Sequence, residues 1–183
     1  MHFDSRRLLF VALLLAGCGQ EEAPSAAPPA AAPASSCGGA GFLNGQLSGA
    51  LTADIAWQDS ELLCESMLRP DDKGVRLRFS GEVSGERLAI IIAMPGLEAH
   101  TTGPDIDAVV TITVEGSGRF FSTPNLGACW ADVDRNVPME AQATTHIVAG
   151  RLTCVAPLGE FNGDAFVELR NLGFSGIAEW GDS

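Results

Sequence analysis

Five cysteines provide the most reactive side chains of this chain of 183 residues, at positions 18, 37, 64, 129 and 154. A cysteine thiolate can attack a substrate, bind a metal, take a lipid or exchange into a disulfide. Cys18 directly follows an apolar run near the N-terminus, whereas the other four are spread over the rest of the chain. Because an odd total leaves one cysteine without a partner in pairwise bonding, we treat Cys18 separately from the other four.

The segment before Cys18 has the three parts of an export signal. Arginines at 6–7 precede an apolar run at 8–16, and small residues stand immediately before the cysteine. The apolar run is too short to cross a bilayer, which takes about 20 residues. The motif Leu15-Ala16-Gly17-Cys18 resembles the lipobox of bacterial lipoproteins. That resemblance implies a signal peptide at 1–17, a thioether-linked diacylglycerol on Cys18 and an acyl chain, such as palmitate, on the new N-terminus.

The expected lipid explains why a cysteine stands at this position. Its sulfur takes a thioether readily, and each buried methylene contributes about 0.8 kcal/mol, so two or three chains anchor a protein stably. Gly19 follows, rather than the Asp typical of lipoproteins kept in the inner membrane, so the same resemblance favours the outer membrane. Two alternatives stay open: an ordinary signal peptide with a chance cysteine, and export through the twin-arginine route, whose signal the segment 5–10 resembles.

The four remaining cysteines, Cys37, Cys64, Cys129 and Cys154, are the candidates for disulfides. Four thiols exported to an oxidising compartment form two disulfides, with three possible pairings. We favour Cys37 with Cys64 and Cys129 with Cys154, because each pair is local in sequence, and closing a loop of about 25 residues contributes on the order of 3 kcal/mol. A zinc site is the alternative, but the chain has no C-x-x-C motif and no closely spaced Cys/His pair to support it.

Composition divides the exported chain into two parts. Residues 18–36 are mostly Ala, Pro, Ser and Glu, so they cannot bury enough surface to offset their ordering entropy, and we expect a flexible tether that begins with the lipidated cysteine. Residues 37–183 have the length of one domain. The net charge of −12 disfavours nucleic acid and anionic membrane surfaces as partners, since both are bound through basic residues.

The pattern of residues 37–183 predicts strands. In "VRLRFSG" Val75, Leu77 and Phe79 alternate with polar residues, as expected for a strand with one wet face. Residues 87–94 are apolar on both faces and predict a central strand, and Gly116-Ser117-Gly118 predicts a hairpin. Nine or ten short strands are expected, the other candidates being 45–57, 62–68, 129–134, 146–156 and 164–174. We predict an all-β fold, a single disulfide-stabilised β-sandwich or flattened barrel, with the first and last strands close together.

Catalytic and metal chemistry is weakly supported. The exported chain has two histidines and no G-x-S-x-G elbow for a nucleophile. We expect His100 in a loop, where Thr101, Asp105 or Asp107 could approach it, and His146 at a surface or edge position. Asp132, Asp134 and Asn136 have the first ligand spacings of an EF-hand, but the glycine and the bidentate glutamate are missing. We therefore assign no catalytic residue, no metal and no cofactor.

A binding patch is the remaining site hypothesis. Phe120 and Phe121 are adjacent in a predicted strand, so one should enter the core and the other face outward. An outward phenylalanine beside Arg119 and near Trp130 would form such a patch, and we take Arg119, Phe121 and Trp130 as its candidates. Core packing is the competing interpretation of Phe121.

These features favour a lipid-anchored binding or interaction module of the cell envelope that recognises an envelope protein or a glycan. The motifs "RLRFSG", "GSGRFFST" and "RLTCVAPLGEFNG" resemble small uncharacterised proteobacterial lipoproteins, a resemblance that transfers no site residues. A structural or assembly accessory of the outer membrane is the alternative, and an envelope hydrolase is the least supported hypothesis. We do not predict an enzyme.

Overall fold

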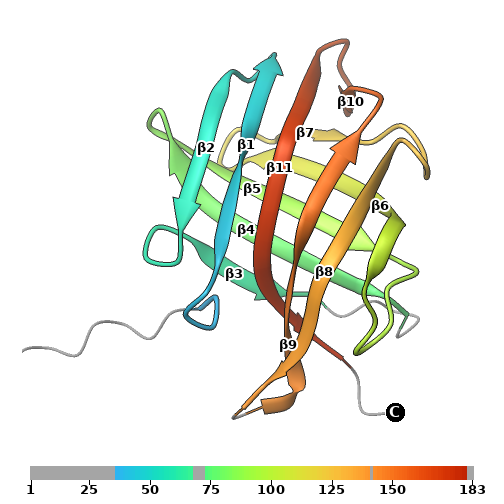
Figure 1. Cartoon of the computed structure of the whole chain (residues 1–183). Coiled ribbons are helices and arrows are strands. Elements are labelled where there is room, and N and C mark those ends of the chain that lie inside the picture. The colour runs from blue at the N-terminus through green and yellow to red at the C-terminus, as the bar shows by residue number, and fades with distance from the viewer. Residues whose placement is uncertain (1–35, 68–72, 141, 181–183) are drawn as a thin grey trace, which may run out of the picture. The chain divides into compact units, whose positions relative to one another are not determined.

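The computed structural model describes residues 36–67, 73–140 and 142–180. The signal peptide, Cys18 and almost all of the expected tether lie outside these residues. The described residues form eleven strands and no helix, which confirms the all-β prediction (Figure 1). The strands are β1 (Phe42–Gly49), β2 (Ala53–Gln58), β3 (Leu63–Ser66), β4 (Val75–Val83), β5 (Glu86–Met94), β6 (Gly103–Val114), β7 (Arg119–Ser122), β8 (Cys129–Met139), β9 (Gln142–Cys154), β10 (Leu158–Glu160) and β11 (Phe166–Glu179).

All the strands belong to one antiparallel sheet that is bent into two layers. The hydrogen-bonded order is β2-β1-β11-β10-β7-β6-β5-β4-β3, and β8 and β9 bridge β6 to β11. In Figure 1 the layer of β2, β1, β11, β9 and β8 lies in front of the layer of β3, β4, β5 and β6. Two paths thus join β6 to β11, one through β8 and β9 and the other through β7 and β10. Strands β2 and β3 are the two edge strands and do not pair with each other. The result is a flattened barrel with one side that hydrogen bonds do not close.

The core fills the space between the two layers. The largest side chains that are almost completely buried include Phe79, Phe121 and Phe174. Strand β5 lies between β4 and β6, as its two apolar faces predicted. Val75, Leu77 and Phe79 point inward from β4, also as predicted. The first and last strands are neighbours, because β1 pairs with β11 from Phe42↔Ser175 to Gly49↔Val167.

Both predicted disulfides are present. Cys37 is bonded to Cys64 and Cys129 is bonded to Cys154. The second disulfide joins residues that are directly opposite in the β8–β9 ladder, where backbone hydrogen bonds already hold the strands. The first disulfide joins the segment before β1 to the edge strand β3, so it crosses the side of the barrel that lacks hydrogen-bonded pairing.

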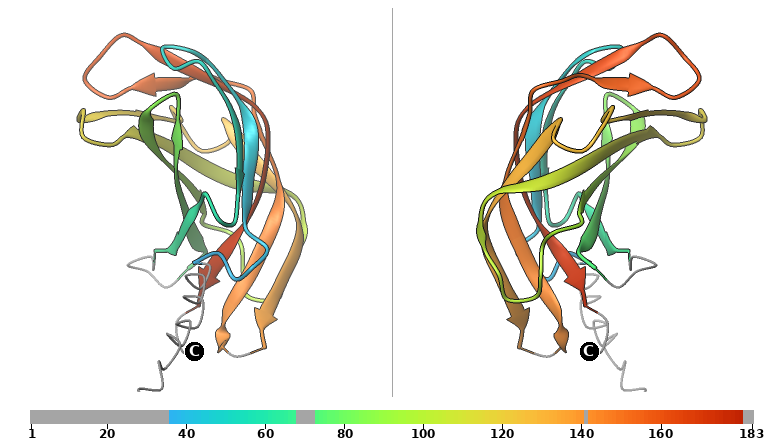
Figure 2. Two further views of the ribbon diagram at one scale, coloured as in Figure 1. Left: turned by 90° about the vertical axis from the view of Figure 1, so that its left-hand side faces the viewer. Right: turned by 90° about the vertical axis from the view of Figure 1, so that its right-hand side faces the viewer.

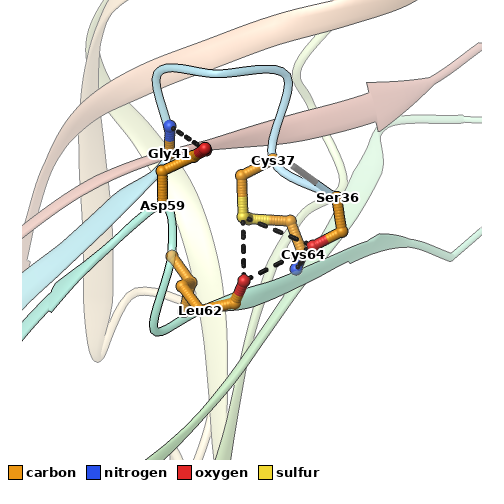
Figure 3. Close-up of a disulfide and its surroundings, with 6 residues drawn as sticks. All are labelled: Ser36, Cys37, Gly41, Asp59, Leu62 and Cys64. Carbon is orange, nitrogen blue, oxygen red and sulfur yellow. Dashed lines mark hydrogen bonds between the residues drawn. A yellow bond between two sulfur atoms is a disulfide. The ribbon is translucent and has the colours of Figure 1, made fainter. Parts of the chain in front are cut away.

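We call this side, between β1–β2 and β3–β4, the seam, and two contacts close it. At one end the Cys37–Cys64 disulfide is buried, and the Ser36 hydroxyl accepts a hydrogen bond of 3.0 Å from the Cys64 amide (Figure 3). A few residues further along β4, the indole of Trp57 on β2 donates to the Glu82 carbonyl at 2.9 Å. A side chain at Gly81 would place its Cβ 2.6 Å from the Trp57 ring, so only glycine permits this closure.

Candidate functional site

Three phenylalanines form an apolar surface at one end of the barrel. Phe120 and Phe161 stack with ring centroids 4.7 Å apart and planes inclined by 17°. Phe161 is 60% exposed and Phe166 is 50% exposed, although phenylalanine is normally among the more buried residues. We call Phe120, Phe161 and Phe166 the aromatic tip. It is the most exposed group of aromatic side chains in the described part of the chain.

Strand pairing explains why these rings meet. The β10 residues Gly159 and Glu160 pair with the two residues that follow Phe120 in β7, and the Phe161 amide donates to the Phe120 carbonyl at 2.9 Å. Phe120 and Phe161 are therefore cross-strand neighbours on the outer face. Gly159 pairs with Phe166, which places the third ring on the same face. Figure 2 shows the β6–β7 and β10–β11 hairpins projecting on the same side of the barrel.

An ion pair joins the two hairpins on the face opposite the rings of the aromatic tip. Arg119 Nε lies 2.6 Å from Glu160 Oε1. The hydrogen bond with Glu160 raises the pKa of Arg119, and the same bond lowers the pKa of Glu160. Both groups are charged at any physiological pH, so the ion pair persists over that range. The guanidinium of Arg119 also lies 5.2 Å from the centroid of the Phe121 ring.

The structure corrects the binding patch expected at Arg119, Phe121 and Trp130. Arg119 is exposed and contacts Phe121, but Phe121 is fully buried in the core and cannot meet a partner. Trp130 is half-buried on the outer face of β8, opposite Asp107 of β6, whereas Phe121 points inward. The outward residue of the Phe120-Phe121 pair is Phe120. The partners of Phe120 come from the β10–β11 region, about 40 residues further along the chain.

His100 and His146, which the sequence analysis treated as separate, are in contact near the start of β9. Their ring centroids are 4.5 Å apart in an edge-on arrangement, and Trp180 covers His146 from another side. The expectation that His146 is a surface or edge residue is wrong, because His146 is only 1% exposed. His100 is exposed in its loop, as expected, and has a positive φ of 61°.

Asn136 determines how His146 is held. The Asn136 amide nitrogen donates to the carbonyls of Glu98 and Thr101, each at 2.9 Å, so its oxygen is left to accept the Nδ1–H of His146 at 2.8 Å. Burial lowers the pKa of His146, and the nearby His100 lowers it further. His146 is therefore neutral at pH 7, and this arrangement ties the loop before β6 to β8 and β9.

The geometry gives no support to the hydrolase hypothesis. In the described residues no hydrogen bond joins His100 to Thr101, Asp105 or Asp107, and the Thr101 hydroxyl instead donates to the Glu98 carbonyl at 2.7 Å. No Ser or Cys side chain is hydrogen-bonded to either histidine in the same residues, so a nucleophile and its base are not paired.

The EF-hand spacing of "DVDRN" has no counterpart in the fold. Asp132 and Asp134 lie on strand β8, and a β-bulge between Val133 and Arg135 turns Asn136 inward to His146. No group of three or more His, Cys, Asp or Glu residues that could hold a metal is found among the described residues.

Comparison of the chain with protein-family models, with curated proteins and with solved structures gives no match. Within residues 36–67, 73–140 and 142–180 there is no helix of the length and apolarity needed to cross a membrane. Exposed, partly stacked rings are suited to binding an apolar surface.

Proposed function

We propose that this protein is a lipid-anchored lipoprotein of the cell envelope that binds a partner protein through the aromatic tip. The proposed anchor is Cys18, and the outer membrane is the favoured location because Gly19 follows the lipobox-like motif. The proposed role is that of a binding module, which needs a stable scaffold and an exposed recognition surface. A disulfide-bonded barrel with one exposed aromatic platform has both.

The observation that carries this proposal is the position of the aromatic tip. The Ala50 amide, just after the end of β1, donates to the Phe166 carbonyl at 2.9 Å. Cys37 lies before the start of β1, so the chain enters the barrel at one end and the tip lies at the other (Figure 1). A domain tethered at its entry point leaves the tip, at the far end of the barrel, free to reach a partner.

The side chains of the tip favour a protein partner over a glycan. Phenylalanine rings have no hydrogen-bonding group, and the nearby charged groups, Arg119 and Glu160, are on the other face of the strands and are bonded to each other. A glycan needs many hydrogen bonds to replace those that it loses with water. A protein partner can instead bury Phe161 and Phe166 in an apolar pocket, as in the centres of many protein interfaces.

In-cell cross-linking tests the partner proposal. The lipidated protein is compared with a Phe161→Ser/Phe166→Ser variant and with a Val137→Ser control. Val137 is also exposed and apolar, at 40%, but it lies on β8 away from the tip. A partner lost in the double variant and retained in the control would support the proposal. An unchanged set of cross-linked proteins, with the variant folded by circular dichroism, would contradict it.

Fractionation tests the anchor separately. Cys18→Ala removes the sulfur that takes the lipid, so we expect the protein to move from the membrane fraction to the soluble envelope fraction. Retention of this variant in the membrane would refute anchoring by Cys18. The alternative role, a structural accessory of the outer membrane, predicts altered membrane integrity in cells that carry the double tip variant without loss of any discrete cross-linked partner.

A further inference from the structure

A groove crosses the outer face of the second layer, on the same face as the aromatic tip, since its lining residue Thr111 pairs with Ser122 of β7. It has a volume of about 360 Å³, and its lining includes Arg76 on β4, Ile91 and Ala93 on β5, Val109 and Thr111 on β6, and Leu126 in the loop after β7. This volume lies in the range of about 300–1,000 Å³ that is usual for small-molecule sites. The groove thus has the size to bind a ligand by itself.

Strand register creates the hollow. Arg76 pairs with Ala93, and Ala93 pairs with Val109, so these three residues form one row across the layer. The middle residue of the row has the smallest side chain, which leaves a depression between the other two. Leu126 is 58% exposed at the rim. The path across the row is therefore apolar except at the arginine.

Arg76 is half-buried in this groove and has no ion pair among the described residues. The contrast with Arg78 is informative, because Arg78 stands two residues along the same strand and pairs with both Glu65 and Glu115. The chain has 11 basic and 23 acidic residues. Among the described residues, a half-buried cation without a carboxylate partner is unexpected in such an acidic protein, and it supplies a specific position for one negative charge.

The rest of the groove offers few hydrogen bonds. Strand β5 is paired on both sides, with β4 and with β6, so its backbone groups are already used. The Thr111 hydroxyl is bonded to the Ser122 hydroxyl at 3.3 Å. A peptide or a sugar in this groove would lose hydrogen bonds to water without replacement. An alkyl chain loses none and gains from burial.

We infer that this groove binds an anionic amphiphile, with its carboxylate or phosphate at Arg76 and its alkyl chain over Ala93 and Val109 toward Leu126. The acidic surface as a whole repels an anionic membrane, so recognition depends on this single arginine. The inference does not depend on the aromatic tip or on its partner.

Titration calorimetry with sodium dodecanoate tests the inference. The protein is the Cys18→Ser form of the chain, purified without detergent. The dodecanoate concentration is kept below its critical micelle concentration. We expect saturable binding with one site per chain. Arg76→Gln should weaken it by at least about ten-fold, the effect of losing a charge-assisted hydrogen bond. Arg78→Gln is the matched control and should change the affinity little.

Three further measurements complete the test. Ala93→Phe fills the depression and should abolish binding while Arg76 remains in place. Dodecanol, which lacks the charge, should bind at least about ten-fold more weakly than dodecanoate. Dodecyl phosphate compared with dodecanoate shows whether a phosphate or a carboxylate is preferred, and saturable binding of either supports the site.

Three results would overturn the inference. They are no binding of either anion, equal binding by the Arg76→Gln and Arg78→Gln variants, and displacement of the probe by an apolar peptide with a blocked C-terminus. Thermal unfolding of each variant shows that the comparison is made between folded proteins.

Discussion

Removal of the Cys37–Cys64 disulfide should weaken this protein in a different way from removal of Cys129–Cys154. The first disulfide closes a sequence separation of 27 residues and the second closes 25. For loops of this length the chain-entropy model gives a loss of about 3.5 kcal/mol for either bond. A domain with a free energy of unfolding of about 5–15 kcal/mol survives that loss, so both double-serine variants should fold.

The difference should be local. Cys129 and Cys154 face each other in the β8–β9 ladder, which keeps its hydrogen bonds when the sulfurs are gone. Cys37 and Cys64 instead span the seam. After the disulfide is removed, the hydrogen bond from the Cys64 amide to the Ser36 hydroxyl is one of the contacts that remain there. The edge strand β3 has only four residues. We therefore expect β3 and residues 36–41 to open without global unfolding.

Native-state hydrogen exchange with mass spectrometry measures both effects. A global loss of about 3.5 kcal/mol speeds exchange through complete unfolding by about 300-fold in either variant. The Cys37→Ser/Cys64→Ser variant should show additional fast exchange confined to residues 36–41 and 63–66. Equal exchange of these segments in the two variants would refute the argument that the disulfide, rather than packing, closes this end of the seam.

Three further outcomes are expected from single substitutions. Since the pKa of His146 is lowered by burial, the folded chain binds fewer protons than the unfolded chain below about pH 6.5. The free energy of unfolding should therefore decrease as the pH is lowered below this value, and His146→Gln should reduce this pH dependence in urea titrations. An unchanged pH dependence in the variant would contradict the prediction. Phe121→Ala should lower the free energy of unfolding by about 3–5 kcal/mol and Phe120→Ala by much less, because only Phe121 is fully buried; equal losses in urea titrations would disprove this assignment. Gly81→Val should displace Trp57, lowering the melting temperature and shifting tryptophan fluorescence toward longer wavelength, and unchanged values would show that the seam can adapt.

The features that the sequence predicted depend on local patterns. The disulfide pairing was predictable because each partner is near in sequence, and β5 was predictable because a strand with apolar residues on both faces needs neighbours on both sides. The expected strand at 45–57 proved to be two strands, because Gly49 has a φ of +99° and β1 ends there. Alternation along the chain could not show this break, since apolar residues continue on both sides of it.

The features that the sequence missed depend on contacts between distant segments. Alternation required one of Phe120 and Phe121 to face outward, but the choice between them depends on the pairing of β7 with β10. His146 is packed against His100 and Trp180, which come from distant segments. Its partner Asn136 faces inward because the bulge in β8 changes which face the later residues of that strand occupy. The aromatic tip also depends on distant segments, because Phe161 and Phe166 join Phe120 only when the β10–β11 hairpin lies beside β7.

The placement of β1 has a mechanical consequence. This strand runs from the entry point of the chain to the aromatic tip, between β2 and β11. Tension applied between residue 36 and the tip would act along the strand axis, so the hydrogen bonds of both ladders would be sheared together instead of being broken one after another. The Cys37–Cys64 disulfide would pass part of this tension to β3 and the second layer. The fold is thus oriented to resist pulling between the start of β1 and the aromatic tip.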